Sequence, residues 1–252
     1  MKATFFKSAG LVATIAITTS SLAATSGSKG RSVGAGLSFP SSHQALHVNS
    51  SALAEVDGMS MQGLWDFQNE EPAVTLVGSQ KSFGWGLGWM DNGVANRYDA
   101  GIGINLGGML VGANLYTTDF EGLNGDVTAT IDLTKLRVAL GFRAIDNGLD
   151  RFNAGVGFNV NKLLISLDMY KNLPWDRDDL YGLDASVAYN GGTVGFGLGY
   201  DFYYLNGLGD GDLHADLSLT VTKSVALEGH YRLTPGYDSS IPDFSAGARI
   251  LF

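Results

Sequence analysis

The side chains best suited to acid–base chemistry are the four histidines, His43, His47, His214 and His230. If the residues on either side of 222–224 form a hairpin, Asp216 lies beside His230 and Ser218 lies beside Glu228. A serine, a histidine and a carboxylate within reach of one another could serve a hydrolase or acyltransferase that acts on lipid. Charge pairing across the hairpin explains the same pattern without catalysis, and we favour it. We therefore predict that the protein is not an enzyme.

Two of the histidines also have a spacing that could suit a metal. His43 and His47 are four residues apart, so a helix would place both imidazoles on one face. Two ligands without a carboxylate partner are weak evidence for a metal site. The glycine-rich run at 195–199 is not a phosphate-binding loop, because no helix follows it. We predict no metal site and no cofactor.

A larger set of ionisable residues lies on one face of segments in which every second residue is apolar. The set is Asp99, Asp126, Asp132, Arg137, Arg143, Asp216, Glu228, His230 and Arg232. Charges of both signs on one face either line a water-filled pore or lock a closed interior through salt bridges. In an open pore, such charges set the selectivity. Both interpretations require elements that present these residues to a shared interior.

The elements that would position them are β-strands. In the stretch SFGWGLGWM, residues 82–90, bulky Phe83, Trp85, Leu87 and Trp89 alternate with three glycines and a serine. From residue 58 to the C-terminus the chain contains about fourteen such segments of roughly ten residues, the strand length that crosses a bilayer at a tilt. One face is apolar almost throughout, and the other carries Gly, Asp, Arg, Asn, Ser and Thr.

This pattern predicts an all-β fold, a transmembrane antiparallel up-and-down β-barrel of about fourteen strands, with twelve also possible. A soluble sandwich would carry more charge on its outer faces. Short turns alternate with longer polar connections, so an even strand count places both termini in the periplasm. The longer connections include residues 119–125, 145–150 and 205–211. Aromatic residues gather near the segment ends, as expected for two girdles at the lipid headgroups.

Turn positions also predict the register between neighbouring strands. A two-residue turn at 134–135 sets Asp132 against Arg137 and Asp126 against Arg143, two pairs of opposite charge. A turn at 190–191 sets Asp184 against Gly197 by the same rule.

Composition agrees with a secreted membrane protein. The chain has 252 residues, a formal net charge of -9, 16% charged residues, 35 glycines and no cysteine. So low a charged fraction is unusual for a soluble domain, and the acidic balance argues against nucleic acid as a partner. A basic start followed by a short apolar run predicts a signal peptide at residues 1–23. Localisation in a bacterial outer membrane follows.

Residues 24–57 do not alternate and precede the barrel of residues 58–252. Their small-residue run and the sequence NSSALA resemble the N-terminal region of the long-chain fatty-acid transporter family of the outer membrane. The resemblance implies a fourteen-stranded barrel with this segment as a plug in the lumen, and Asn49, Ala52 and Leu53 as the plug motif. Ser50 stands where the family has proline.

The final residues, FSAGARILF, resemble the C-terminal strand signal that the barrel-assembly machinery reads, with Phe252 last. The expected surroundings are the lipid bilayer and lipopolysaccharide, and the sequence does not determine the oligomeric state. The leading functional hypothesis is a narrow channel or transporter for small or hydrophobic solutes. The alternative is a non-conducting structural or interaction barrel with exposed surface loops.

Overall fold

A computed structural model describes most of the chain. The described residues are 31–91, 94–133, 135–145, 148–172, 181–205, 208–233 and 243–252. The predicted signal peptide and the first residues of the 24–57 segment lie outside this part and remain predictions.

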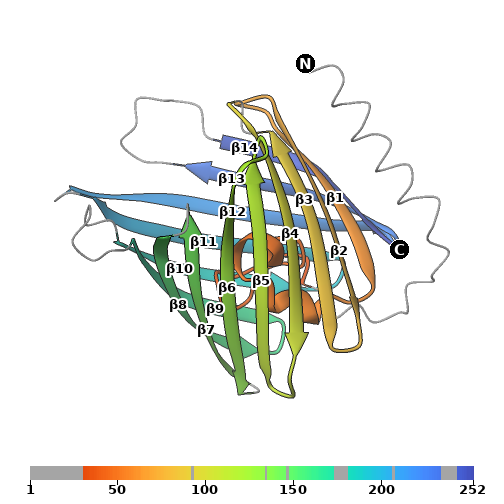
Figure 1. Cartoon of the computed structure of the whole chain (residues 1–252). Coiled ribbons are helices and arrows are strands. Elements are labelled where there is room, and N and C mark those ends of the chain that lie inside the picture. The colour runs from red at the N-terminus through yellow and green to blue at the C-terminus, as the bar shows by residue number, and fades with distance from the viewer. Residues whose placement is uncertain are drawn as a thin grey trace.

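Over the described residues, fourteen antiparallel strands form a closed barrel in which each strand pairs with its neighbours in sequence and β1 pairs with β14 (Figure 1). The predicted fold is therefore confirmed, with fourteen strands rather than twelve. The strands are β1 (Met59–Asp66), β2 (Glu71–Gln80), β3 (Phe83–Asp91), β4 (Asn96–Asn105), β5 (Met109–Thr118), β6 (Glu121–Leu133), β7 (Leu136–Ile145), β8 (Gly148–Val160), β9 (Leu163–Asn172), β10 (Tyr181–Asn190), β11 (Val194–Leu205), β12 (Leu208–Thr222), β13 (Val225–Leu233) and β14 (Asp243–Leu251).

Three of the connections predicted to be long are short. β5 and β6 are joined by Asp119 and Phe120 alone, both with positive φ, of 47° and 62°. β7 and β8 are separated by residues 146–147, and β11 and β12 by residues 206–207. The prediction was wrong because polar and glycine residues continue the backbone ladder, which does not depend on apolar side chains. Several strands therefore exceed the roughly ten residues that a bilayer requires.

The register bears out both predicted charge pairs at the 134–135 turn. Asp132 faces Arg137 and Asp126 faces Arg143 across β6 and β7. The hairpin of β12 and β13 likewise sets Asp216 against His230 and Ser218 against Glu228.

One predicted pairing is wrong, because Asp184 faces Asp201 and not Gly197. Asn190 faces Gly195 and the N–H of Gly191 donates to the carbonyl of Val194, so the two-residue turn lies at 192–193 instead of 190–191 and the whole hairpin shifts. As a result an aspartate faces an aspartate across these strands.

The outward face of the barrel is apolar. Leu87, Leu115 and Leu167 are 52%, 52% and 59% exposed, although each lies within a strand. Aromatic pairs lie near the strand ends, with Phe67 stacked on Phe244 at 5.6 Å between ring centroids. A belt of exposed apolar side chains with aromatic pairs at its edges suits the hydrocarbon and headgroup layers of a bilayer.

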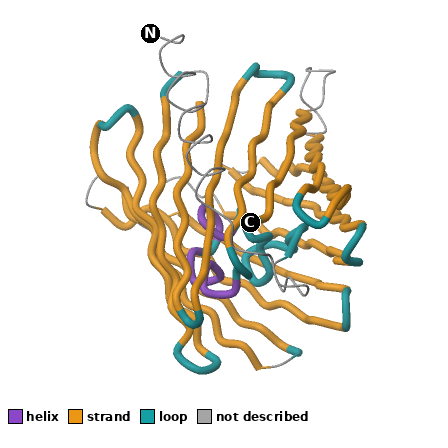
Figure 2. The backbone as a smooth tube through the Cα atoms, turned by 90° about the vertical axis from the view of Figure 1, so that its right-hand side faces the viewer, coloured by secondary structure: helices purple, strands orange, loops and turns teal. Residues whose placement is uncertain are grey.

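Residues 31–57 lie inside the barrel. In the described part they form a bridge between Ala35 and Phe39, the short helix α2 (Ala45–Val48) and the 3-10 helix η1 (Ser50–Glu55). Both helices lie within the ring of strands (Figures 1 and 2). Among the helices of the described residues, none is long and apolar enough to cross a membrane. We call residues 31–57 the plug.

Candidate functional site

The plug lies against glycines on the inner wall of the barrel. A Cβ added to Gly103 of β4 would lie 2.6 Å from the carbonyl oxygen of Ser50, and one added to Gly112 of β5 would overlap the backbone of Ser50 and Ser51. A Cβ added to Gly84 of β3 would be closer still to the carbonyl oxygen of Leu53. The bare wall thus allows the backbone of η1 to approach the strands directly.

The predicted motif residues are at the centre of this contact. Asn49 and Leu53 are each 0% exposed, and Ala52 is buried beside them. The Asn49 amide donates to the carbonyl of Leu37 within the plug and to the Thr130 hydroxyl of β6, both at 2.9 Å. Asn49 therefore links two parts of the plug to one another and to the wall.

Further hydrogen bonds join η1 to β6. The backbone N–H of Ser51 donates to the Thr128 hydroxyl at 2.9 Å, and the hydroxyls of Ser51 and Thr130 are 2.9 Å apart. Leu46 and Leu53 pack with Val77 of β2 in a small apolar cluster. A buried polar group that loses its partner costs roughly 1–3 kcal/mol, so these paired groups favour one docked position.

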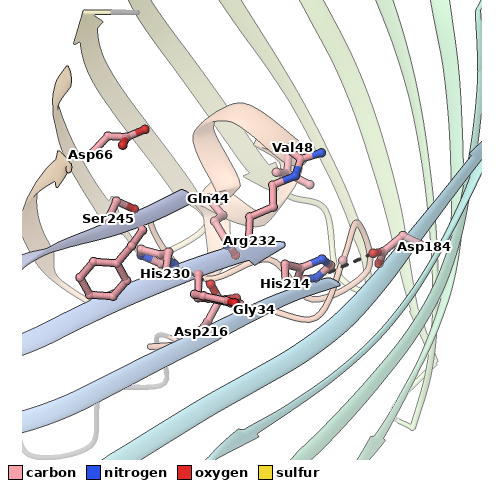
Figure 3. Close-up of a pocket in the computed structure, with 13 residues that line it drawn as sticks. Gly34, Gln44, Val48, Asp66, Asp184, His214, Asp216, His230, Arg232 and Ser245 are labelled. Atoms are coloured by element: carbon pink, nitrogen blue, oxygen red, sulfur yellow. Dashed lines mark hydrogen bonds and ion pairs between the residues drawn. The ribbon is translucent and has the colours of Figure 1, made fainter. Parts of the chain in front are cut away.

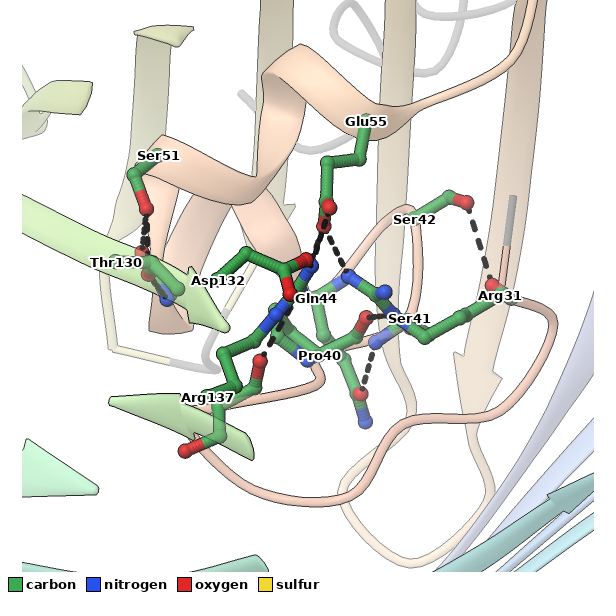
Figure 4. Close-up of polar contacts among 12 residues, drawn as sticks. Arg31, Pro40, Ser41, Ser42, Gln44, Ser51, Glu55, Thr130, Asp132 and Arg137 are labelled. Carbon is green, nitrogen blue, oxygen red and sulfur yellow. Dashed lines mark hydrogen bonds and ion pairs between the residues drawn. The ribbon is translucent and has the colours of Figure 1, made fainter. Parts of the chain in front are cut away.

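Glu55 joins the plug to the wall through charge. Its carboxylate pairs with Arg31 of the plug at 2.8 Å and with Arg137 of β7, whose guanidinium also donates to Asp132 at 2.6 Å (Figure 4). Burial alone would raise the pKa of the Glu55 carboxyl, but the two guanidiniums lower this pKa to about 2. Glu55 is therefore a partly buried anion between two cations, and removing either cation would leave its charge without part of its compensation.

Two strand residues hold the first part of the plug. The Asn190 side-chain oxygen accepts from the backbone N–H groups of Ser32 and Val33, at 3.0 and 3.1 Å. The Asp168 carboxylate of β9 accepts from the N–H of Leu37 at 2.8 Å. These bonds attach the plug to β6, β7, β9 and β10.

Charged residues line open space beside the plug. Two of the cavities have volumes of about 420 Å³ each, and both are lined by Gly36, Val48, Asp184, His214 and Arg232. Figure 3 shows the first of them. One extends to Asp66, Phe244 and Ser245 near the ends of β1 and β14. The lumen is thus partly filled by the plug and partly lined with ionisable groups.

Eight of the nine predicted lumen-lining residues fall into two groups, and Glu228 is apart from both. Asp132 and Arg137 hold the plug through Glu55. Asp99 is buried, accepts from Arg97 at 2.8 Å, and lies 3.5 Å from His47 of the plug. These three predicted residues contact or support the plug.

The second group lies away from that contact. Asp126, Arg143 and Arg232 line one cavity, and Asp216, His230 and Arg232 line the other. His230 and Asp216 lie 2.6 Å apart, as their register predicts.

Arg143 faces Asp126 in the register, yet its guanidinium donates to Asp150 at 2.8 Å. Glu228 pairs with Arg249 at 3.0 Å and lies 5% exposed, which makes it part of a buried pair rather than an open lining.

The sequence did not identify Glu55, Asn190 or Asp212. The alternation that places His214 and Asp216 inward also places Asp212 inward. Asp212 was missed because it directly follows the loop predicted at 205–211, whereas β12 already begins at Leu208. The plug has no strand or helix period that could mark Glu55.

The side chains considered for hydrolysis and for metal binding do not come together in the structure. The Ser218 hydroxyl donates to Glu228 at 3.5 Å, whereas His230 pairs with Asp216. His43 precedes α2 and its Nε2 lies 3.0 Å from the Ser60 hydroxyl, while His47 faces Asp99. In the part of the chain that the structure describes, no group of three or more His, Asp or Glu residues converges as a metal site.

A closed antiparallel barrel with an apolar outer face and a charged, plugged lumen has the architecture of a transmembrane β-barrel. A scan of the sequence against models of protein families gives no match, and neither does a comparison with curated protein sequences. The chain is similar in structure to the CymD monoaromatic hydrocarbon channel, with a TM-score of 0.62 and 11% identity over 87% of this chain and 98% of that chain.

The outer membrane protein Omp33 of Acinetobacter baumannii is also similar in structure, with a TM-score of 0.56 and 11% identity over 77% of this chain and 96% of that chain. At such identity the likeness shows a shared fold. That fold is the closed antiparallel barrel found in outer-membrane proteins.

Because the plug backbone lies against glycines of the inner wall, we predict that Gly103→Val weakens plug docking. The added side chain collides with the backbone of Ser50 and Ala54, which cannot move as a flexible side chain would. Overpacking of this kind costs about 1–3 kcal/mol. Hydrogen exchange of residues 45–55 should become faster while the strands keep their protection. Gly63→Val is the control, because a Cβ there meets nothing within 4 Å. Equal exchange in the two variants would contradict the close contact.

Acid should also loosen the plug. The docked pKa of Glu55, about 2, is below its ordinary value of 4.5, so its contribution is complete above pH 4.5 and is lost as the pH falls toward 2. Burial, together with nearby Arg249 and His47, lowers the pKa of His43 to about 3, so its contribution begins to fall below pH 6.5.

Exchange of residues 45–55, corrected for the intrinsic rate at each pH, should therefore quicken on acidification. Glu55→Gln should quicken exchange already at neutral pH and flatten the response between pH 4.5 and 2. Glu70→Gln, in the exposed loop after β1, should behave as the unaltered protein does. A pH response that Glu55→Gln leaves unchanged would refute this role.

Proposed function

We propose that this protein is an outer-membrane channel for small solutes that the plug holds closed. The observation that carries the proposal is the pairing of an apolar outer wall with a charged lumen, in which a separate segment is attached through side chains. A purely structural barrel could fill its interior with wall side chains. Here the inner walls of β3, β4 and β5 carry glycines, and their space is filled by a segment that is not part of the sheet. Such a segment can move without opening the backbone ladder.

The lining favours small polar solutes over hydrophobic ones. Asp184, His214 and Arg232 contribute to both large cavities, and Asp66 and Asp216 extend the charged surface. A hydrophobic solute would have to displace water from these groups without replacing its hydrogen bonds. The similar CymD barrel is titled a monoaromatic hydrocarbon channel, which supports passage of small molecules but not the same chemistry.

The plug motif supports a distant relation to the long-chain fatty-acid transporter family. Asn49, Ala52 and Leu53 are buried at the contact of plug and wall, as the resemblance implies. The relation proposed is one of architecture, a fourteen-stranded barrel with an N-terminal plug, and it does not extend to fatty acids as solutes.

The remaining surroundings follow from the same proposal. The apolar outer face would contact the lipid bilayer and lipopolysaccharide. Both termini would lie in the periplasm, on the side of the turns at 81–82 and 223–224. The final strand, ending at Phe252, would be read by the barrel-assembly machinery.

The alternative is a non-conducting interaction barrel, which the number of plug contacts favours. Conductance of the purified protein in planar bilayers separates the two. We expect small, infrequent openings for the full chain and a larger, steady conductance after deletion of residues 24–57. Arg137→Ala, which removes the cation between Glu55 and Asp132, should increase the open probability. No conductance in any of the three proteins would overturn the channel proposal.

A further inference from the structure

Four aspartates form a row across four neighbouring strands. Asp168 of β9 faces Asp184 of β10, Asp184 faces Asp201 of β11, and Asp201 faces Asp212 of β12. All four line the same cavity of about 420 Å³. Like charges directly opposite each other on adjacent strands destabilise a sheet. Positive charge placed beside such a row would therefore stabilise it.

Positive charge is present in the cavity, where Arg97, Arg143 and Arg151 are also lining residues, but the contacts to the row itself are fewer. Arg232 donates to Asp212 at 2.8 Å, and His214 lies 3.8 Å from Asp184. The Tyr170 hydroxyl is 3.5 Å from Asp201, and Asp168 accepts from the plug.

Two carboxylate oxygens of the row remain without a donor. Oδ1 of Asp184 and Oδ1 of Asp212 are buried and accept no hydrogen bond from the described residues. Asp212 is only 2% exposed. A buried carboxylate oxygen without a donor is costly, and a ligand that carries N–H groups would remove the cost.

The spacing of the row indicates which cation fits. Neighbouring strands lie about 4.8 Å apart, so the four carboxyls extend along a line rather than around a point. They do not meet as a metal site in the described part of the chain. Ammonium groups separated by three methylenes lie about 5 Å apart in an extended chain, by ordinary bond lengths. Val48 and Tyr170 line the same cavity and offer apolar contact to such methylenes.

We propose that the aspartate row binds a linear polyamine, with successive ammonium groups paired to carboxyls on successive strands. The inference names a solute class for the channel and rests on that proposed function. Binding can nevertheless be measured whether or not the barrel conducts. The row ends at Asp168, which also accepts from Leu37 of the plug, so the bound solute would lie directly beside the plug.

The test is calorimetric titration of the purified full-length protein in detergent at low ionic strength, with spermidine as the probe. We expect one bound spermidine, and propylamine at least about tenfold weaker, because it can pair with one carboxyl only. Asp184→Asn combined with Asp201→Asn should weaken spermidine binding by about tenfold or more. Asp126→Asn is the matched control, since it removes one carboxylate from the same cavity outside the row. We expect it to change the affinity less than about twofold.

Folding of each variant is checked by heat-modifiable electrophoretic mobility, and single Asp201→Asn replaces the double variant if that fails to fold. Equal binding of spermidine and propylamine would overturn the proposal, as would equal losses in the row and control variants. Absence of spermidine binding would overturn it as well. Spermidine binding without conductance would support the polyamine site and contradict the channel proposal. Conductance without spermidine binding would support the channel proposal and contradict the polyamine site.

Discussion

The direct approach of the plug backbone to a wall without side chains is the constraint on which the rest of the structure depends. Where η1 crosses β4 and β5, Gly103 and Gly112 leave no space for even a Cβ. This contact fixes the depth of the plug in the lumen. It also brings Asn49 within reach of Thr130 and Glu55 within reach of Arg137. The alternating glycines of β3 belong to the same arrangement, with their bulky neighbours directed to the outer face.

The charged residues of the lumen fall into two groups, those that hold the plug and those that line open space. Those beneath the plug, such as Asp132 and Arg137, complete a partly buried network that includes Glu55. Those beside it, such as Asp184 and Arg232, line open space. Asp168 belongs to both groups, because it accepts from the plug and lines the cavity. A solute in the cavity and the plug would therefore share one carboxylate, which connects the proposed site physically to the closed state.

Much of the fold was predictable because alternation and turn chemistry are local. The period of two revealed the barrel, and the 134–135 turn fixed the pairing of Asp132 with Arg137. The pairing of Asp184 with Asp201 was missed because it depends on which two residues form the turn, 190–191 as predicted or 192–193 as the structure has it. Arg143 faces Asp126 as predicted, but its guanidinium donates to Asp150, because a long side chain can reach the next strand. Glu55 could not be assigned, because its partners are set by tertiary contact and not by any repeat.

The most direct test of the plug's position uses a pair of introduced cysteines, because the chain has none of its own. The hydroxyls of Ser51 and Thr130 lie 2.9 Å apart, so Ser51→Cys with Thr130→Cys should form a disulfide under mild oxidation. Ser51→Cys with Thr220→Cys, on β12 six strands away, should not. The cross-linked protein should stay closed in planar bilayers and open more often after reduction. Failure of the first pair to cross-link, or equal conductance before and after reduction, would contradict a plug that docks on β6 and closes the lumen.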